Sequence, residues 1–159
     1  MPAVSSPATP GAGSSSTWHT EPVNDLTWLL VVGQILAGLA ALTHVYIWVL
    51  ESVLWSTPST YRTFGVRSAE EAETLRPMAY NQGFYNLFLA FGVVVGIVLA
   101  WVDEFHSAGL AVMLFACLSM VLAAVVLITS NRRMARAALV QGAFPLLSLI
   151  ATGLYLLLP

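Results

Sequence analysis

Four long apolar stretches, separated by short charged or turn-forming segments, dominate this sequence. They extend over residues 26–55, 78–101, 107–129 and 137–158. A helix needs about 20 mostly apolar residues to cross a hydrocarbon core of roughly 30 Å, so each stretch is long enough to span a membrane. Short connections between successive spans favour antiparallel neighbours. The sequence therefore predicts an all-α integral membrane protein in which four transmembrane helices form one antiparallel bundle, a single domain over residues 26–158.

The composition supports this class and excludes two others. Hydrophobic residues make up 58% of the 159 residues and charged residues only 9%, against about 25% in a soluble domain. A soluble domain of this size leaves roughly a third of its unfolded surface exposed, so it cannot hide so much apolar area. Six arginines, no lysine and eight acidic residues leave no basic surface for nucleic acid. A soluble globular protein and a nucleic-acid partner are both excluded.

The first 25 residues differ from the rest of the chain. They are rich in Ser, Thr, Pro, Gly and Ala and contain no arginine. Such a segment buries too little apolar surface to order itself, so we expect residues 1–25 to be a disordered tail. It also lacks the basic start and apolar run of a signal peptide. Trp28, Trp55 and Trp101 stand at predicted span ends, where tryptophan rings favour the membrane interface.

The arginines predict an orientation. All six lie in the two connections on one side of the predicted bundle: Arg62, Arg67, Arg76, Arg132, Arg133 and Arg136. Arginine-rich loops stay in the cytoplasm, so we expect a multi-pass protein of the plasma (cytoplasmic) membrane with both termini outside. In the first of these connections, Ser68 and Glu71 have the spacing of a capping box for a short helix, and Pro77 suits the first turn of the second span.

Polar side chains within the spans gather in the cytoplasmic half. His44 and Glu51 are seven residues apart on one face of the first span, about 10.5 Å along its axis, so another group must lie between them. The second span begins with a polar run and the fourth adds an amide, which gives as candidate ligand-binding residues Asn81, Gln82, Tyr85, Asn86 and Gln141. Polar groups in a membrane are costly and often functional, so we predict a polar pocket near this face.

Structural interpretations of the same residues stay open. Glu51 lies near the predicted membrane edge and would then reach headgroup water. His44 and the Asn81–Asn86 run would serve as hydrogen-bonding groups between helices, which contribute about 0.6 kcal/mol each. Gly92 and Gly96 form a GxxxG pair that seats either a helix of the same chain or a second copy in a homo-oligomer.

No residue pattern indicates a cofactor or a metal. Cys117 stands alone within the third span, where it is expected to be a small buried apolar residue. Asp103, Glu104 and His106 are expected to form a solvated turn rather than a metal site. No spacing suits haem, zinc or a nucleotide, so the sequence predicts no cofactor.

Several of these polar positions belong to a longer pattern. The segments His44–Glu51, Phe64-Gly65, Asn81–Ala90 (NQGFYNLFLA) and Gln141-Gly142 with Pro145 resemble a family of small four-span prokaryotic membrane proteins, domain-of-unknown-function family 1304. The resemblance covers about residues 30–157, and its most specific part is the NQG-x-YN-x-FLA run. It implies marked polar positions at His44, Glu51, Asn81, Gln82, Tyr85, Asn86 and Gln141. The chain departs from the family at residues 124–130, which implies a different ligand where that stretch lines the pocket. The resemblance implies no activity.

Three functions remain in competition. In the first, the pocket binds a small amphipathic or lipid-like molecule from the membrane, with His44 as general acid/base and Glu51 orienting it. In the second, the protein is a structural subunit of a membrane complex or homo-oligomer, and the polar cluster holds helices together. The third is proton-coupled transport, which the apolar outer half and the lack of an internal repeat disfavour. No motif identifies a substrate or a reaction, so it stays open whether the protein is an enzyme.

Overall fold

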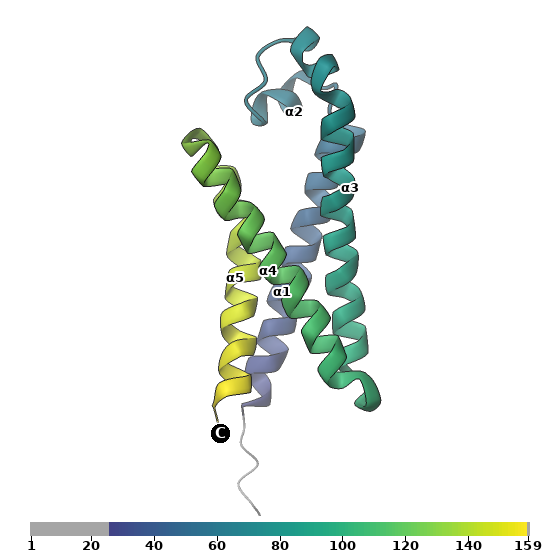
Figure 1. Ribbon diagram of the computed structural model, residues 1–159, viewed down its shortest axis with the longest axis vertical. Coiled ribbons are helices and arrows are strands. Elements are labelled where there is room, and N and C mark those ends of the chain that lie inside the picture. Colours follow the sequence, from purple (N-terminus) through teal and green to yellow (C-terminus); the bar gives the residue numbers. More distant parts are fainter. Residues whose placement is uncertain (1–25, 159) are drawn as a thin grey trace, which may run out of the picture.

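The computed structural model describes residues 26–158, and the predicted tail lies outside these residues. Four long helices run alternately up and down and form an antiparallel bundle, as the sequence predicted (Figure 1). The elements, in chain order, are α1 (Thr27–Trp48), a π-helical segment (Val49–Val53), α2 (Pro58–Thr63), α3 (Ala69–Ala100), a 3-10 turn (Asp103–Phe105), α4 (His106–Ser130), a second 3-10 turn (Arg132–Met134) and α5 (Ala135–Leu157).

The four long helices form a ring in which each helix packs against two neighbours. Helix α1 packs against α3 and α5, and α4 packs against the same two helices from the other side. The end where α2 lies also holds the connection between α4 and α5, and we call it the loop end (Figure 1). At this end α4 leans away from α1 and α3, so the bundle widens there.

Helix α3 is longer than the second predicted span. It begins at Ala69, where Ser68 Oγ accepts a hydrogen bond from the backbone N–H of Glu71 at 3.1 Å. The predicted cap is therefore present, but the expected short helix continues without a break into the span. Pro77 lies inside α3 rather than in a first turn, which corrects that expectation. With 32 residues the helix is about 48 Å long, so it extends well beyond a hydrocarbon core.

Small residues fill the interior and large apolar residues cover the outside. Ala37, Ala90 and Cys117 are buried in the central cluster, and Met113 and Met120 fill the space between them. Large side chains face outward instead, among them Phe88, Phe91, Phe115, Trp101 and Leu157. This distribution suits a bundle surrounded by lipid, where small interface residues let helix backbones approach closely.

The glycine pair on α3 packs against α4 of the same chain. A Cβ atom at Gly96 would lie 2.5 Å from the backbone nitrogen of Met113, and one at Gly92 would meet the Cβ of Ala116 at 3.6 Å. Gly109 on α4 meets the backbone of Ala100 just as closely. These glycines fix the α3–α4 pair. A homo-oligomer through Gly92 and Gly96 stays a prediction that one chain does not test.

The connection at the loop end is packed rather than free. Trp55, Tyr61, Val66, Ala72 and Ala79 form a second buried apolar cluster. The indole Nε1 of Trp55 donates a hydrogen bond to the carbonyl of Ala72 at 2.7 Å. Trp55 is thus an internal anchor between this connection and α3, and not the interfacial residue that its place in the sequence predicted. Trp28 and Trp101 are exposed, as expected.

We expect the substitution Trp55→Phe to loosen this connection. It removes one buried hydrogen bond, which costs about 1 kcal/mol, and frees the residues that follow. Limited trypsin digestion should then cleave faster after Arg62 and Arg67, both in this connection. Trp101→Phe is the matched control, because Trp101 is 70% exposed and should change nothing. Equal cleavage rates in wild type and Trp55→Phe would contradict the anchoring role.

Candidate functional site

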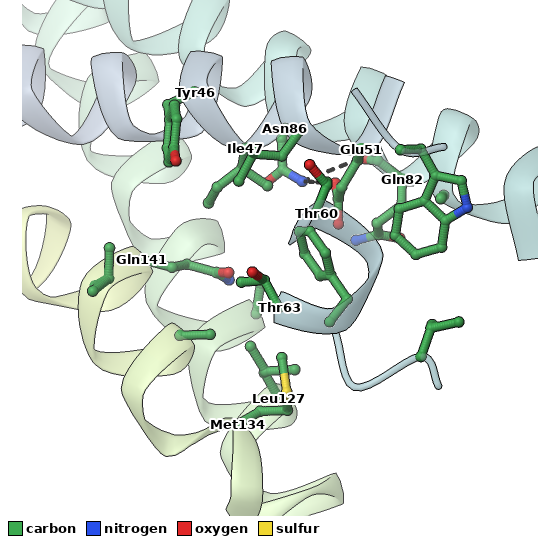
Figure 2. A pocket seen from close by; sticks show the side chains of 18 of the residues that line it. Tyr46, Ile47, Glu51, Thr60, Thr63, Gln82, Asn86, Leu127, Met134 and Gln141 are labelled. Carbon is green, nitrogen blue, oxygen red and sulfur yellow. Dashed lines mark hydrogen bonds between the residues drawn. The ribbon is translucent and has the colours of Figure 1, made fainter. Parts of the chain in front are cut away.

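A large pocket lies at the loop end, where the bundle widens. Its volume is about 1250 Å³. Residues from all four long helices and from α2 line it, and most of them are apolar. The polar side chains that line it include Glu51, Thr60, Thr63, Gln82, Asn86 and Gln141 (Figure 2). Figure 2 shows Glu51, Asn86 and Gln82 on one wall and Gln141 with Met134 on the other.

The central polar contact of the site joins α1 to α3. Asn86 Nδ2 donates a hydrogen bond to Glu51 Oε2 at 2.9 Å, and the same nitrogen lies 3.1 Å from the carbonyl oxygen of Gln82. Only 8% of Glu51 and 7% of Asn86 is exposed. A carboxylate buried this deeply needs a donor, because an unpaired buried charge is very costly. Asn86 supplies that donor, and the second oxygen of Glu51, Oε1, makes no hydrogen bond to a described residue.

A wide helical turn positions Glu51. Residues Val49–Val53 form a π-helical segment directly after α1. Segments of this kind are rare and often occur at functional sites. Helix α3 approaches the wide turn closely at Gly83, where a Cβ atom would clash with Ser52 Oγ. Ser52 Oγ also donates a hydrogen bond to the carbonyl of Tyr80 at 3.2 Å. The close approach brings Asn86 within reach of the carboxylate.

His44 lies elsewhere in the bundle. It is fully buried and is not among the residues that line the pocket. Its Nδ1 atom is 2.9 Å from the carbonyl oxygen of Ala40 in the preceding turn. Because a carbonyl only accepts, Nδ1 carries the proton and Nε2 presents a lone pair. Neither His44 Nε2 nor Trp48 Nε1, one turn away, has a hydrogen-bond partner among the described residues. The partner of Glu51 is thus Asn86, and the geometry gives no support to direct acid–base chemistry by His44 in this pocket.

The other predicted ligand-binding residues separate into two groups. Gln82, Tyr85, Asn86 and Gln141 line the pocket together with Glu51. Asn81 is exposed on α3 and does not line it. The run at the start of the second span therefore faces two ways, since only its Gln82 and Asn86 side follows the pocket wall.

Sequence reasoning missed the contributions of the connections. Thr60 and Thr63 come from α2, and two arginines, Arg133 and Arg136, come from the junction of α4 with α5. The only sequence signal for the arginines is their place in a loop on the side of the polar residues. Among the described residues, no group of three or more His, Cys, Asp or Glu side chains gathers to hold a metal ion.

The chain matches a known protein family. A family model described as a protein of unknown function, DUF1304, matches residues 38–153. The chain belongs to this family. The match confirms the resemblance drawn from the His44–Glu51 and Asn81–Ala90 segments, and it includes every residue that lines the pocket. No curated protein and no solved structure matches the chain.

The end of α4 forms part of the pocket wall. Residues 124–130, where we expect the sequence to depart from the family pattern, contribute Val126, Leu127 and Ser130 to the pocket lining. The expected departure therefore lies at the pocket itself. Tyr46 and Ile47 on α1 and Gln82, Tyr85, Asn86 and Leu89 on α3 line the pocket and lie within the segments of the resemblance.

Proposed function

We propose that this DUF1304 protein binds a small amphipathic or lipid-like molecule in the pocket at its loop end. The observation that carries the proposal is a buried carboxylate–amide pair in the wall of a mostly apolar pocket of about 1250 Å³. Ligand pockets of roughly 300–1000 Å³ hold drug-sized molecules, so this volume suits a larger amphiphile. A few placed polar groups within apolar walls fix the orientation of such a ligand.

The polar residues have distinct roles in this proposal. Asn86 holds Glu51 through Oε2, which leaves Oε1 to accept a hydrogen bond from a hydroxyl or amine of the ligand. Gln82 and Gln141 offer amides from opposite walls (Figure 2). Of the pair predicted as catalytic, only Glu51 lines the pocket, so any proton transfer to a bound molecule falls to Glu51. His44 then serves the packing of α1.

The orientation follows from the arginines. All six lie at or near the loop end, in the two connections or near the start of α3 or α5. Under the positive-inside rule the pocket opens at the cytoplasmic face of the plasma membrane, and the bilayer leaflet on that side supplies the ligand. The structural-subunit and proton-coupled-transport hypotheses stay predictions, and no contact among the described residues favours either.

A substitution that fills the pocket should abolish binding. Ala123 on α4 lines the pocket, so Ala123→Phe places an aromatic ring in the ligand volume. We expect native mass spectrometry of the full chain, released from its own membrane, to show a retained small molecule in wild type. Ala123→Phe should lower that retention by tenfold or more.

Ala111→Phe provides the matched control. Ala111 is an exposed residue of the same helix and does not line the pocket, so this variant should retain the molecule like wild type. A wild-type protein that carries no small molecule would overturn the proposal. Equal loss in both variants would do the same, because it would place the bound molecule on the outer surface rather than in the pocket.

A further inference from the structure

Two arginines at the pocket indicate the chemistry of the ligand. We infer that the molecule is an anionic phospholipid whose phosphate group contacts Arg133 and Arg136. This inference rests on the proposed function and names the ligand class for the same site. The charges at the pocket, the helix end that carries them and the apolar lining beside them support it.

The two arginines are positive charges with no described counter-charge. Arg133 lies in the 3-10 turn before α5 and Arg136 in the first turn of α5, and both line the pocket. The ion pair found in the described part of the chain, Arg76 with Glu73, involves neither of them. Guanidinium groups bind phosphate oxygens through two parallel hydrogen bonds. Arg133 and Arg136 are therefore available to a ligand.

The charge balance of the pocket favours an anion. Its charged lining consists of Arg133, Arg136 and Glu51, which leaves a net positive charge. Glu51 accepts a hydrogen bond from Asn86 and lies on the wall opposite Met134, the residue that follows Arg133 (Figure 2). A ligand whose phosphate lies near the arginines and whose hydroxyl reaches Glu51 would make polar contacts with both walls.

The start of α5 adds to this positive potential. Its N-cap residue, Met134, makes no side-chain hydrogen bond to the helix, whereas Asn131 Oδ1 caps the preceding 3-10 turn by accepting a hydrogen bond from the backbone N–H of Arg133. Met134 and Ala137 both line the pocket. The partial positive charge of a helix N-terminus attracts phosphate and carboxylate groups, and here it lies beside the two arginines in the chain.

The apolar lining favours a lipid over a soluble anion. Val126 on α4 and Val140 on α5 line the pocket although 65% and 53% of these residues are exposed. Val140 lies four residues beyond Arg136, about 6 Å further along α5. Hydrocarbon chains would cover this surface, which a soluble phosphate would leave bare.

Arg132 provides an internal comparison. It precedes Arg133 in the same turn but does not line this pocket, and instead borders a smaller recess with Thr129 and Ala135. Replacing Arg132 changes the net charge of the loop end while leaving the pocket lining intact. The Arg132 variant therefore distinguishes a phosphate contact inside the pocket from a general attraction of anionic lipid to the positive charge of the loop end.

The test is competitive lipid binding to the full-length protein. Purified protein in neutral detergent is mixed with equal amounts of phosphatidylglycerol and phosphatidylcholine that carry the same acyl chains, and retained lipid is measured by native mass spectrometry. We expect wild type to retain phosphatidylglycerol at least tenfold over phosphatidylcholine. The double variant Arg133→Gln/Arg136→Gln should lower phosphatidylglycerol retention tenfold or more, because it removes two charge-assisted contacts.

Two further variants keep the result interpretable. Arg132→Gln should retain phosphatidylglycerol within twofold of wild type. Arg133→Lys/Arg136→Lys keeps both charges and should recover part of the preference that the glutamine variant loses. Partial recovery would tie the loss to charge at these positions and not to unfolding.

Distinct outcomes overturn the inference. Loss in Arg132→Gln equal to that in the double variant would show a diffuse surface attraction only. Equal retention of both lipids by wild type would show that the headgroup charge does not determine which lipid binds. The Ala123→Phe result would still test binding in the pocket itself. Displacement of phosphatidylglycerol by an equal amount of soluble glycerol phosphate would show that a free anion, and not a lipid, is the ligand.

Discussion

Replacing Gly109 with alanine should destabilise the bundle more than the same change at any other described glycine. The new Cβ atom would meet the backbone nitrogen of Ala100, the carbonyl carbon of Leu99 and the carbonyl oxygen of Gly96 at once. Backbone atoms of a packed helix cannot move aside as a flexible side chain can, so α3 and α4 must separate. We expect the free energy of unfolding to fall by about 3 kcal/mol. Thermal unfolding in detergent, followed by circular dichroism, measures this loss.

Gly153→Ala is the control for the same chemical change. Gly153 lies in α5, and a Cβ atom there would meet nothing within 4 Å. Alanine favours a helix over glycine by about 1 kcal/mol, so this variant should be as stable as wild type or slightly more stable. If Gly109→Ala were equally well tolerated, the close α3–α4 contact would not exist as described.

Asn86→Leu should produce the second-largest effect. It removes the hydrogen-bond donor of Glu51 and leaves the carboxylate in an apolar wall without a partner. Leaving a buried charged group unsatisfied costs about 3 kcal/mol. Asn81→Leu is the control within the same polar run, because Asn81 is exposed and lies off the pocket, and its effect should not exceed about 0.5 kcal/mol.

A double-mutant cycle separates the contact from its two ends. Glu51→Leu leaves Asn86 Nδ2 its second acceptor, the carbonyl oxygen of Gln82, so this variant should cost less than Asn86→Leu. The double variant Glu51→Leu/Asn86→Leu should be more stable than the sum of the two single losses predicts, since it leaves no unpaired carboxylate. Strict additivity would mean that Glu51 and Asn86 do not interact.

The fold could be predicted because it depends on properties that sequence displays directly. The number of apolar stretches long enough to cross a membrane gives the number of membrane helices. The connections that carry arginines show where the chain turns back. The start of α3 is harder to predict, since the cap at Ser68 is confirmed but the helix after it does not stop before Pro77. A proline inside a helix costs one hydrogen bond and is tolerated when neighbouring structure compensates. In α3 the helix continues through Pro77 without a break.

The sequence gathered Glu51, Gln82 and Gln141 from three predicted spans, but it did not predict which of these side chains touch. Gln82 and Asn86 are four residues apart, so helical periodicity alone places them on one face. The partner of Glu51 depends on which helix packs beside it and on the close approach at Gly83, neither of which periodicity describes. Thr60 and Arg133 come from connections distant in sequence, so only the tertiary structure brings them to the pocket.

The π-helical segment has a consequence for how this family tolerates length changes. A wide turn holds one residue more than an α-helical turn, so it behaves as an insertion that the helix has absorbed. Deleting one residue from 49–53 would restore an ordinary α-helical turn, so the chain after it would keep its direction while the side chains within the turn would change place. Trp55 would then keep its approach to Ala72, but the carboxylate of Glu51 would leave its place beside Asn86. A DUF1304 sequence with a gap at this position is thus expected to have lost the site, whatever residues it keeps.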